Sequence, residues 1–360
     1  MPKIVTQLTL VVFVALVARP AHAADTPPLA TLPQITNAAP DSTTAATTET
    51  FVPTTIQYPG STSTAARGIN NSGDIVGTYT CAVACINPVT GETSTPGTHG
   101  FLLQDGVYTR IDVPGGTATV ARGIGEQRMI VGQYAVGAVT HGFAYFAGFY
   151  LYPIDVPTEA FDHPGSPLRN TLAVRISPEG DIVGCFHEDV QTTMHGWLLH
   201  NGKLSVLVTP HSAGDRTSHD PDTMNNGVAS TGEIVGFYGS SGVSYIARNN
   251  VVVTTFTFDG NLFTLAWDVN ARGDIVGVHG DNQANTVGAA VNPHGFLRTK
   301  HGEYTSLDVQ GAIGTTVFGV NARREIVGTY TDATGVHGFL YRLRGGRDER
   351  DGDDERDRDR

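Results

Sequence analysis

The chain has 360 residues, of which 40% are hydrophobic and only 16% are charged, and its formal net charge at neutral pH is −12. It is long enough to bury a substantial hydrophobic core. The acidic balance excludes a generally basic nucleic-acid-binding protein and disfavours binding to anionic membrane surfaces. The 43 glycines and 19 prolines indicate a fold that is rich in turns.

The N-terminal residues 1–23 have the pattern of a secretory signal peptide. Lys3 supplies the positive charge, an apolar run extends from Leu8 to Ala18, and Ala21-His22-Ala23 matches the small-residue cleavage pattern. The run is shorter than the roughly 20 residues of a membrane-spanning helix. We therefore expect a bacterial protein that is secreted or periplasmic, with no membrane span after cleavage. An uncleaved N-terminal anchor is the alternative.

The segments on either side of the central region have compositions that do not favour a core. Residues 24–49 are mostly Thr, Ala and Pro, and residues 345–360 are mostly Arg, Asp, Glu and Gly. Neither segment buries enough apolar surface to offset the entropy lost on ordering. We therefore expect a disordered spacer, a disordered charged tail, and a folded region over 50–344.

Three short motifs recur along the folded region. Ile-Val-Gly is followed by a His-Gly-aromatic triplet, and the repeat ends with a segment such as Ile-Asp-Val. The Ile-Val-Gly copies begin at Ile75, Ile130, Ile182, Ile234, Ile275 and Ile326. The histidines of the triplet are His99, His141, His195, His294 and His337, and the fourth copy reads Val243-Ser244-Tyr245 instead. Self-similarity at intervals of about 40–50 residues is typical of a repeat architecture.

Each repeat is expected to form four short antiparallel β-strands. The first strand ends before a turn such as Asn70-Asn71-Ser72-Gly73, whose Asn and Gly suit a tight hairpin. Ile-Val-Gly opens the second strand, the His-Gly-aromatic segment forms the third, and Ile-Asp-Val forms the fourth. Because no helical periodicity is sustained after the signal peptide, these units predict an all-β, six-bladed β-propeller of four-stranded blades.

The two ends of the repeat region complement each other. The last repeat stops at Tyr341-Arg342, after its third strand, whereas the segment 54–60 resembles a fourth strand and precedes the first complete repeat. We expect this N-terminal strand to complete the last blade, which would close the ring and remove its open edges. An open solenoid of the same repeats is the alternative.

The motif combination Gly-Ile-Asn-x-x-Gly-x-Ile-Val-Gly followed by His-Gly-Phe-Leu resembles the bacterial extracellular HAF repeats, which are named for a His-Ala-Phe triplet. The resemblance covers roughly residues 51–342, and this chain has Gly where that triplet has Ala. It implies export and a repetitive fold. It implies no particular biochemical activity, because the family is a class of sequences without a general one.

The recurring histidines suit either a metal site or a structural role. Converging imidazoles would form a strong metal site, but a residue that repeats in nearly every unit more often performs the same structural task in each. We therefore expect each histidine to bridge backbone groups of neighbouring strands. By the same logic, Asp112, Asp155 and Asp308 of the fourth strands are expected to cap a turn or to bond a neighbouring strand.

Residues that do not repeat are better candidates for a functional site. The loops after the second and fourth strands of a blade open on one face of a propeller, and here they carry many acids and histidines. The candidate catalytic residues are Asp162, His163, His187, Glu188, His219 and Asp220. The candidate metal ligands, for Ca²⁺ or another divalent metal, are His211, Asp215, His219 and Asp222. Solvated loop polarity is the default interpretation, because no fixed metal-ligand spacing is present.

Four charged residues lie on the first strands, which border the central channel of a propeller. Arg67 and Arg122 occupy one repeat position, at which the other repeats have uncharged residues. Arg175 and Asp268 occupy the next position, which is glycine in the other repeats. We expect these four residues to bind an anionic ligand or to form salt bridges between blades.

The three cysteines cannot all pair with one another. Cys81 and Cys85 share the long loop between the second and third strands of the first repeat, and they are expected to form a disulfide in an oxidising compartment. Cys185 directly follows Ile-Val-Gly on a strand, so we expect a buried free thiol.

The leading hypothesis for function is a monomeric binding or surface-interaction module, whose partner is an extracellular glycan or a cell-surface protein and not a nucleic acid. The sequence contains no nucleophile elbow, phosphate loop or dinucleotide fingerprint. The alternative is an extracellular hydrolase or lyase that acts on a polysaccharide through the acids and histidines of the rim.

Overall fold

The computed structural model describes residues 45–157, 170–187, 194–207, 223–239, 241–259, 263–280 and 292–343. Within these ranges the secondary structure consists of β-strands and contains no helix, so the predicted all-β class is confirmed. No helix capable of crossing a membrane is therefore found in the described part of the chain.

The repeats form antiparallel four-stranded sheets in the predicted order. The first two are β3 (Ser63–Ile69), β4 (Ile75–Cys81), β7 (Gly97–Gln104) and β8 (Val107–Ile111), then β9 (Ala118–Ile124), β10 (Ile130–Val136), β11 (Val139–Phe146) and β12 (Phe149–Ile154). The next two are β13 (Asn170–Ile176), β14 (Ile182–His187), β15 (Met194–His200) and β16 (Lys203–Val206), then β17 (Thr223–Val228), β18 (Glu233–Tyr238), β19 (Val243–Arg248) and β20 (Val251–Phe256).

The last repeats recruit strands from the N-terminal segment. One sheet contains β21 (Phe263–Val269), β22 (Ile275–Gly280), β23 (His294–Arg298) and β24 (Tyr304–Val309), with β1 (Thr47–Phe51) as a fifth, parallel strand on β24. The last repeat contains β25 (Gly314–Val320), β26 (Glu325–Asp332) and β27 (Gly335–Arg342), with β2 (Thr54–Ile56) antiparallel to β27. A parallel bridge between Val336 of β27 and Ser63 of β3 joins these strands and those of the first repeat into one eight-stranded sheet. A short pair, β5 (Cys85–Ile86) and β6 (Thr93–Ser94), extends the connection between β4 and β7.

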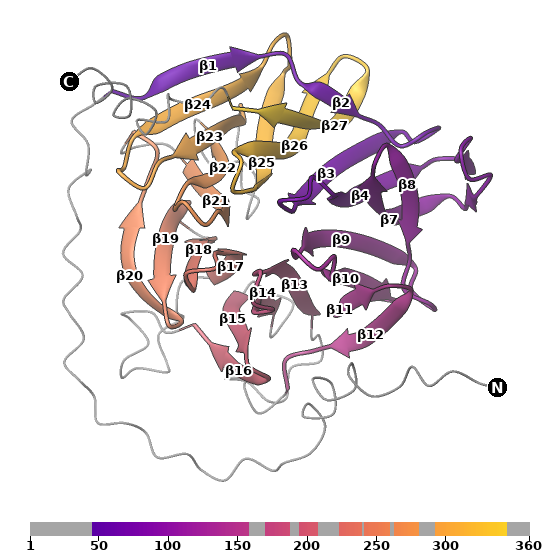
Figure 1. Ribbon diagram of the computed structural model, residues 1–360, viewed down its shortest axis with the longest axis horizontal. Coiled ribbons are helices and arrows are strands. Elements are labelled where there is room, and N and C mark those ends of the chain that lie inside the picture. Colours follow the sequence, from indigo (N-terminus) through magenta and orange to yellow (C-terminus); the bar gives the residue numbers. More distant parts are fainter. Residues whose placement is uncertain are drawn as a thin grey trace, which may run out of the picture.

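The sheets are arranged around a common centre, with the first strand of each repeat innermost (Figure 1). Each inner strand contacts the next along the series β3, β9, β13, β17, β21 and β25, and β25 in turn contacts β3. Hydrophobic clusters lie between adjacent sheets, so that each sheet buries its faces against its neighbours. The described strands thus have a β-propeller-like arrangement.

The glycine of Ile-Val-Gly lets an aromatic ring pack directly on the strand. A Cβ atom on Gly77 would lie 1.9 Å from the carbonyl oxygen of Ala65 and 2.8 Å from the ring of Phe101, which belongs to the His-Gly-aromatic triplet of the same sheet. Phe101 itself is fully buried. The two motifs therefore recur together because they form one packing unit.

The recurring histidine and aspartate are partners. The Nδ1 atom of the histidine lies 2.7–2.8 Å from the carboxylate oxygen of an aspartate that lies in, or directly after, the fourth strand, in the pairs His99–Asp112, His141–Asp155 and His294–Asp308. The shared partner of these three histidines is thus an aspartate side chain, whereas the sequence suggested backbone groups. His99 also has a backbone partner, since its Nε2 lies 2.8 Å from the carbonyl oxygen of Thr95.

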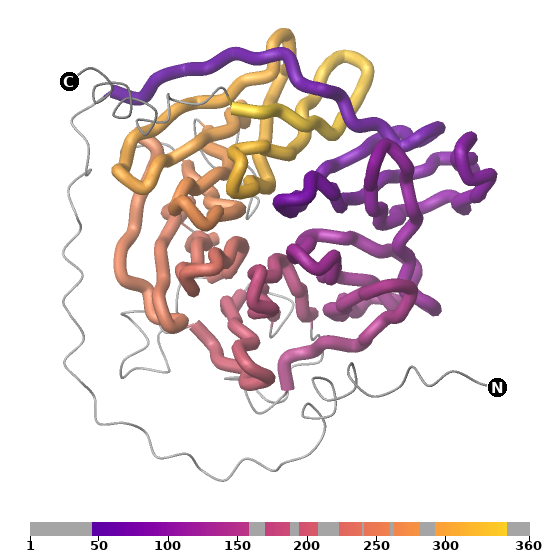
Figure 2. Tube along the Cα trace, in the orientation of Figure 1, coloured from indigo at the N-terminus to yellow at the C-terminus, as the bar shows by residue number. Residues whose placement is uncertain are grey.

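The N-terminal strand β2 completes the last repeat, as its sequence predicts. Gln57, just after β2, takes the place of the recurring aspartate, and its Oε1 lies 2.9 Å from Nδ1 of His337. The segment before β2 lies side by side with β24, on the outside of the sheets (Figure 2).

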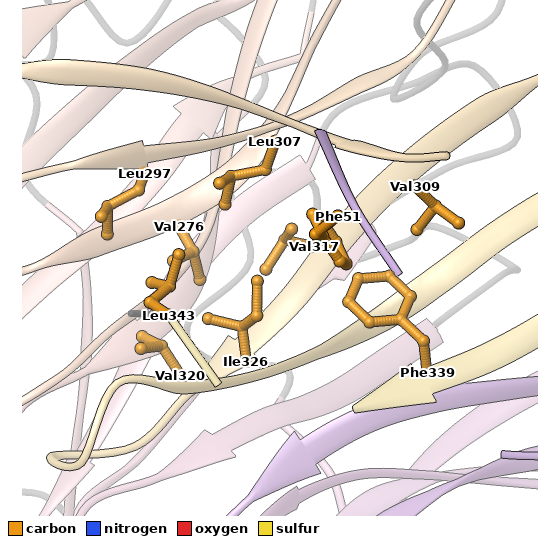
Figure 3. Close-up of a cluster of buried hydrophobic side chains, with 10 residues drawn as sticks. All are labelled: Phe51, Val276, Leu297, Leu307, Val309, Val317, Val320, Ile326, Phe339 and Leu343. Atoms are coloured by element: carbon orange, nitrogen blue, oxygen red, sulfur yellow. The ribbon is translucent and has the colours of Figure 1, made fainter. Parts of the chain in front are cut away.

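The prediction of a disordered spacer over residues 24–49 is wrong at the C-terminal end of this segment, because β1 begins at Thr47. The backbone of β1 pairs with the edge of β24, and Phe51 inserts its buried ring into the hydrophobic cluster beneath (Figure 3). Phe51 also stacks on Tyr341 with a centroid distance of 4.1 Å. A run of small polar residues is thus ordered by pairing with an exposed strand edge and by one aromatic anchor.

The predicted disulfide between Cys81 and Cys85 is present, and Cys185 is a buried free thiol, as expected. Burial raises the pKa of the Cys185 thiol to about 12, with the charge of Arg122 opposing this effect. We therefore expect the denatured, unreduced protein to react with one equivalent of a thiol reagent, and the reduced protein with three. Three reactive thiols before reduction would contradict the disulfide.

Candidate binding site in the central channel

Each inner strand has a β-bulge at the same place, which turns one additional side chain towards the channel. The bulge follows from the pairing with the second strand, which skips one residue in every repeat. The skipped residues are Arg67, Arg122, Val174, Asn226, Trp267 and Phe318. The residue after each of them is Gly68, Gly123, Arg175, Gly227, Asp268 and Gly319. The predicted matching positions therefore lie at equivalent places around the channel.

Arg175 fills the centre of the channel. Its Nη1 donates hydrogen bonds to the carbonyl oxygens of Arg67 (3.0 Å) and Arg122 (2.9 Å). Its Nη2 donates to the carbonyl oxygens of Trp267 (3.4 Å) and Phe318 (2.5 Å). Because these carbonyls belong to β3, β9, β21 and β25, one buried guanidinium on β13 joins five of the inner strands.

Asp268 supplies the counter-charge to Arg175. Its Oδ1 lies 3.1 Å from Nε of Arg175, and its Oδ2 accepts a hydrogen bond from the backbone N–H of Val320. Burial raises the pKa of Asp268, while the charge of Arg175 opposes that rise. The expected salt bridge between repeats therefore forms between Arg175 and Asp268. The charged groups of both side chains are bonded to other groups of the protein.

The glycines beside Arg175 leave room for its guanidinium and for close strand approach. A Cβ atom on Gly68 would lie 2.8 Å from the carbonyl oxygen of Arg122 and 3.0 Å from Nη1 of Arg175. A Cβ atom on Gly123 would lie 2.9 Å from the Cα of Arg175. The glycines at the positions equivalent to Arg175 therefore leave the space that the Arg175 side chain occupies.

A pocket lies on one side of the Arg175 plug. Its lining, which we call the arginine pocket, consists of Arg67, Arg122, Val174, Arg175, Trp267 and Phe318. The space in it that a water-sized sphere can occupy is only about 10 Å³, which is about the room that one water molecule needs. Two arginines face it from adjacent strands, and a valine and two aromatic rings form the rest of its wall.

The two arginines of this pocket have neutral side-chain partners. Nε of Arg122 donates to Oε1 of Gln133 (2.6 Å), and Nε of Arg67 donates a long hydrogen bond to Oγ1 of Thr78 (3.4 Å). The guanidinium of Arg67 also lies over the ring of Phe318, 4.9 Å from its centroid. No described carboxylate forms a salt bridge with either guanidinium.

Burial and the repulsion between like charges disfavour the protonated forms of Arg67 and Arg122. Burial, followed by the charges of Arg122 and Arg175, lowers the pKa of Arg67 to about 9. Burial is also the largest cause of the lowered pKa of Arg122, about 10; the nearby Cys185 raises it and the charge of Arg175 lowers it. Both groups remain cationic at neutral pH. Among the described residues, three arginines therefore share one carboxylate in the channel, and an anion would relieve this imbalance.

Two buried polar atoms at the bulge positions have no hydrogen-bond partner within the described structure. They are Nε1 of Trp267 and Oδ1 of Asn226. Sequence reasoning placed both residues at the position of Arg67 and Arg122 but assigned neither to a site. The sequence does carry one indication that this position is functional. Its side chain varies between cationic, aromatic, aliphatic and amide residues, whereas the neighbouring motifs repeat.

A second depression opens on the opposite side of Arg175 and Asp268, near the hairpin turns. It encloses about 490 Å³, including open solvent. Its wall contains the last residue of each inner strand, namely Ile69, Ile124, Ile176, Val228, Val269 and Val320. Polar residues, among them Glu126 and Asn270, also line this depression. The ion pair therefore lies between a mixed polar and apolar depression on the turn side and the arginine pocket on the other.

Most of the predicted rim residues lie outside the part of the chain that the structure describes. These are Asp162, His163, Glu188, His211, Asp215, His219, Asp220 and Asp222. His187 is described and partly buried at the end of β14, opposite Asn170. Burial and the charge of His195 lower its pKa. Among the described residues, no group of three or more His, Cys, Asp or Glu side chains is arranged to hold a metal ion.

No family model and no curated protein matches the chain. Among solved structures, it is similar to a streptogramin B lyase at 10% identity, covering 79% of this chain and 95% of that one, with a TM-score of 0.44. It is similar to regucalcin, a calcium-binding protein of Agrobacterium tumefaciens, at 11% identity, with 82% and 95% covered and a TM-score of 0.47. It is similar to virginiamycin B lyase of Staphylococcus aureus at 10% identity, covering 79% of this chain and 97% of that one, with a TM-score of 0.43. Such distant similarity assigns no activity to this chain.

Proposed function

We propose that this chain is an exported, six-bladed β-propeller that acts as a binding module and holds a small anionic ligand in its central channel. The six-bladed, closed form is supported by the equivalent four-stranded units, by the pairing of β2 with β27, and by the contact of β25 with β3. Export is supported by the signal-peptide pattern of residues 1–23. The HAF-type motifs support membership in that bacterial extracellular family.

The observation that carries the proposal is the uncompensated positive charge in the arginine pocket. Arg67 and Arg122 line a shared space, and neither has a carboxylate partner among the residues that the structure describes. Arg67 and Arg122 are partly buried, and partial burial of cations without counter-charges costs free energy unless another group neutralises them. A bound anion supplies that group.

The test compares wild type with the Arg67→Gln, Arg122→Gln and double variants in the absence and presence of sodium sulfate, phosphate, acetate or benzoate at constant ionic strength. We expect at least one anion to raise the melting temperature of wild type, because a ligand that binds only the folded state stabilises it. The double variant should lose this response. Arg248→Gln, which changes an exposed arginine paired with Glu233, is the matched control and should retain it.

The same variants separate binding from a structural role. If Arg67 and Arg122 serve an anion, then in anion-poor buffer each Gln variant should keep or raise the free energy of unfolding, because one of two partly buried like charges is removed. If they serve the fold alone, each variant should lose stability and no anion should distinguish them from wild type. That second result would overturn the proposed function.

A further inference from the structure

We infer that the arginine pocket holds a single halide ion beside Arg67 and Arg122, and that the preferred ion is chloride. This inference rests on the proposed function and narrows it from a small anion to a monatomic one. Its basis is the size of the pocket, the charge balance of the described residues around it and the apolar character of its remaining wall.

The pocket has room for one particle of about the size of water. A water-sized sphere can occupy about 10 Å³ of it, and a single water molecule needs roughly 10–15 Å³. A chloride ion is only slightly larger than a water molecule, whereas acetate, benzoate, phosphate and sulfate contain several non-hydrogen atoms. A polyatomic anion therefore reaches the two partly exposed arginines from the open side of the pocket alone, and we expect it to bind more weakly than chloride.

The hydrogen bonds of Arg67 and Arg122 leave the ends of both guanidinium groups available. Nε of Arg67 donates to Thr78, and Nε of Arg122 donates to Gln133. Within the described part of the chain, no hydrogen bond involves an Nη atom of either arginine. Most of the N–H donors of each guanidinium can therefore bind an anion.

Among the described residues, no negative charge compensates these two arginines. Asp268 pairs with Arg175. The thiol of Cys185 would compensate Arg122 as a thiolate, but burial raises the pKa of this thiol to about 12. Cys185 is therefore uncharged at neutral pH. A water molecule would fill the space without supplying a charge, whereas a halide ion supplies both.

The rest of the wall suits an ion that has no directional hydrogen-bonding needs. Val174, Trp267 and Phe318 complete the lining. Val174 and Phe318 carry no donor, and Nε1 of Trp267 is buried. An oxygen atom of a carboxylate, sulfate or phosphate that faced this wall would lack a partner, which costs free energy. A halide is one spherical charge, so its contact with the guanidinium groups leaves no second atom unpaired.

Chloride NMR tests binding to the unmodified protein, because a chloride ion that exchanges with a protein site has a broader line than free chloride. Sodium chloride is titrated at constant ionic strength, with sodium gluconate as the balancing salt. We expect saturable broadening for wild type. Arg67→Gln and Arg122→Gln should each weaken binding about tenfold or more, since hydrogen bonds to charged partners are the strong ones. Arg248→Gln, which changes an exposed arginine, should not weaken it.

Bromide quenching of tryptophan emission tests where the ion lies. The chain has only two tryptophans, and Trp197 packs in a cluster away from the pocket lining. In a Trp197→Phe variant, emission therefore comes from Trp267, which lines the pocket. We expect bromide to quench this emission in a saturable way and chloride to displace it. In the Arg67→Gln/Arg122→Gln background, only collisional quenching that rises linearly with bromide should remain.

Melting temperatures compare the halide with larger anions. Sodium chloride is measured beside sodium acetate and sodium sulfate at equal ionic strength. The difference between wild type and the double variant cancels the general stabilisation that sulfate gives to folded proteins. We expect this difference to be largest in chloride.

The outcomes distinguish this inference from the proposed function. If acetate or sulfate acts through Arg67 and Arg122 as strongly as chloride or more so, the channel still binds anions and the halide assignment is overturned. If chloride binds but bromide quenching does not saturate, the placement in the arginine pocket is wrong. If neither a halide nor a polyatomic anion binds to wild type, the pocket holds water alone and the proposed function itself fails.

Discussion

Replacing Arg175 with methionine is expected to lower the free energy of unfolding by about 3–5 kcal/mol, the range found when one partner of a buried ion pair is removed. The substitution leaves Asp268 charged and buried, and it also removes hydrogen bonds to carbonyl oxygens on four strands. Because those strands belong to different repeats, the loss affects contacts across the whole channel. Urea denaturation at neutral pH measures it.

Two comparisons assign the loss to the ion pair. Adding Asp268→Asn to Arg175→Met removes the uncompensated charge, so the double variant should be less destabilised than the sum of the two single variants. Arg248→Met removes an exposed arginine whose ion pair with Glu233 lies at the surface, and it should change stability by less than about 1 kcal/mol. A loss below about 1 kcal/mol for Arg175→Met would show that the plug is not structural.

The pH dependence of the Arg175→Met variant has a definite sign. Burial already raises the pKa of Asp268 in the folded state, and Arg175 opposes that rise, so removing Arg175 raises the pKa further. A carboxyl whose folded-state pKa lies above its unfolded value stabilises the fold when it is protonated. The deficit of the variant relative to wild type should therefore shrink as the pH falls through this raised pKa, and it should be greatest at neutral pH.

Most of the fold could be predicted from the repeat motifs, because the residues of these motifs pack against one another within each sheet. Ile-Val-Gly and His-Gly-Phe predict neighbouring strands correctly, since the glycine of one accommodates the aromatic ring of the other. The strand at 54–56 was also predictable, from its likeness to a fourth strand. The strand Thr47–Phe51 was not predictable, because it is held by backbone pairing with an edge that lies 258 residues away in the sequence, and its own composition resembles a linker.

The candidate site was predictable in position but not in arrangement. Equivalent positions of the repeats placed Arg67, Arg122, Arg175 and Asp268 beside the channel. Nothing in their spacing shows that Arg175 spans the channel to the carbonyls of four other strands, because that geometry depends on how distant repeats meet. Nor does spacing show that Asp268 pairs with Arg175 and that Arg67 and Arg122 have no carboxylate partner within the described ranges.

Replacing Gly277 with alanine is expected to cost about 3 kcal/mol or more of unfolding free energy, at or above the usual upper range for overpacking a core. The added Cβ would lie 2.1 Å from the carbonyl oxygen of Leu265 and 2.6 Å from the ring of Phe296. The ring could move, but the carbonyl belongs to the β21–β22 pair, so the inner strand itself would have to shift. Yield of folded protein and urea denaturation measure the effect.

Two further variants show whether the carbonyl oxygen of Leu265 or the ring of Phe296 obstructs the added Cβ atom. Gly125 also lies next to an inner strand, but an added Cβ there would have no neighbour closer than 3.6 Å, so Gly125→Ala should change stability by less than about 1 kcal/mol. Adding Phe296→Leu to Gly277→Ala removes the contact with the ring and leaves the contact with the carbonyl. If the backbone is the obstacle, this second change does not restore stability. Full restoration would instead mean that the Ile-Val-Gly glycine exists to seat the aromatic ring alone.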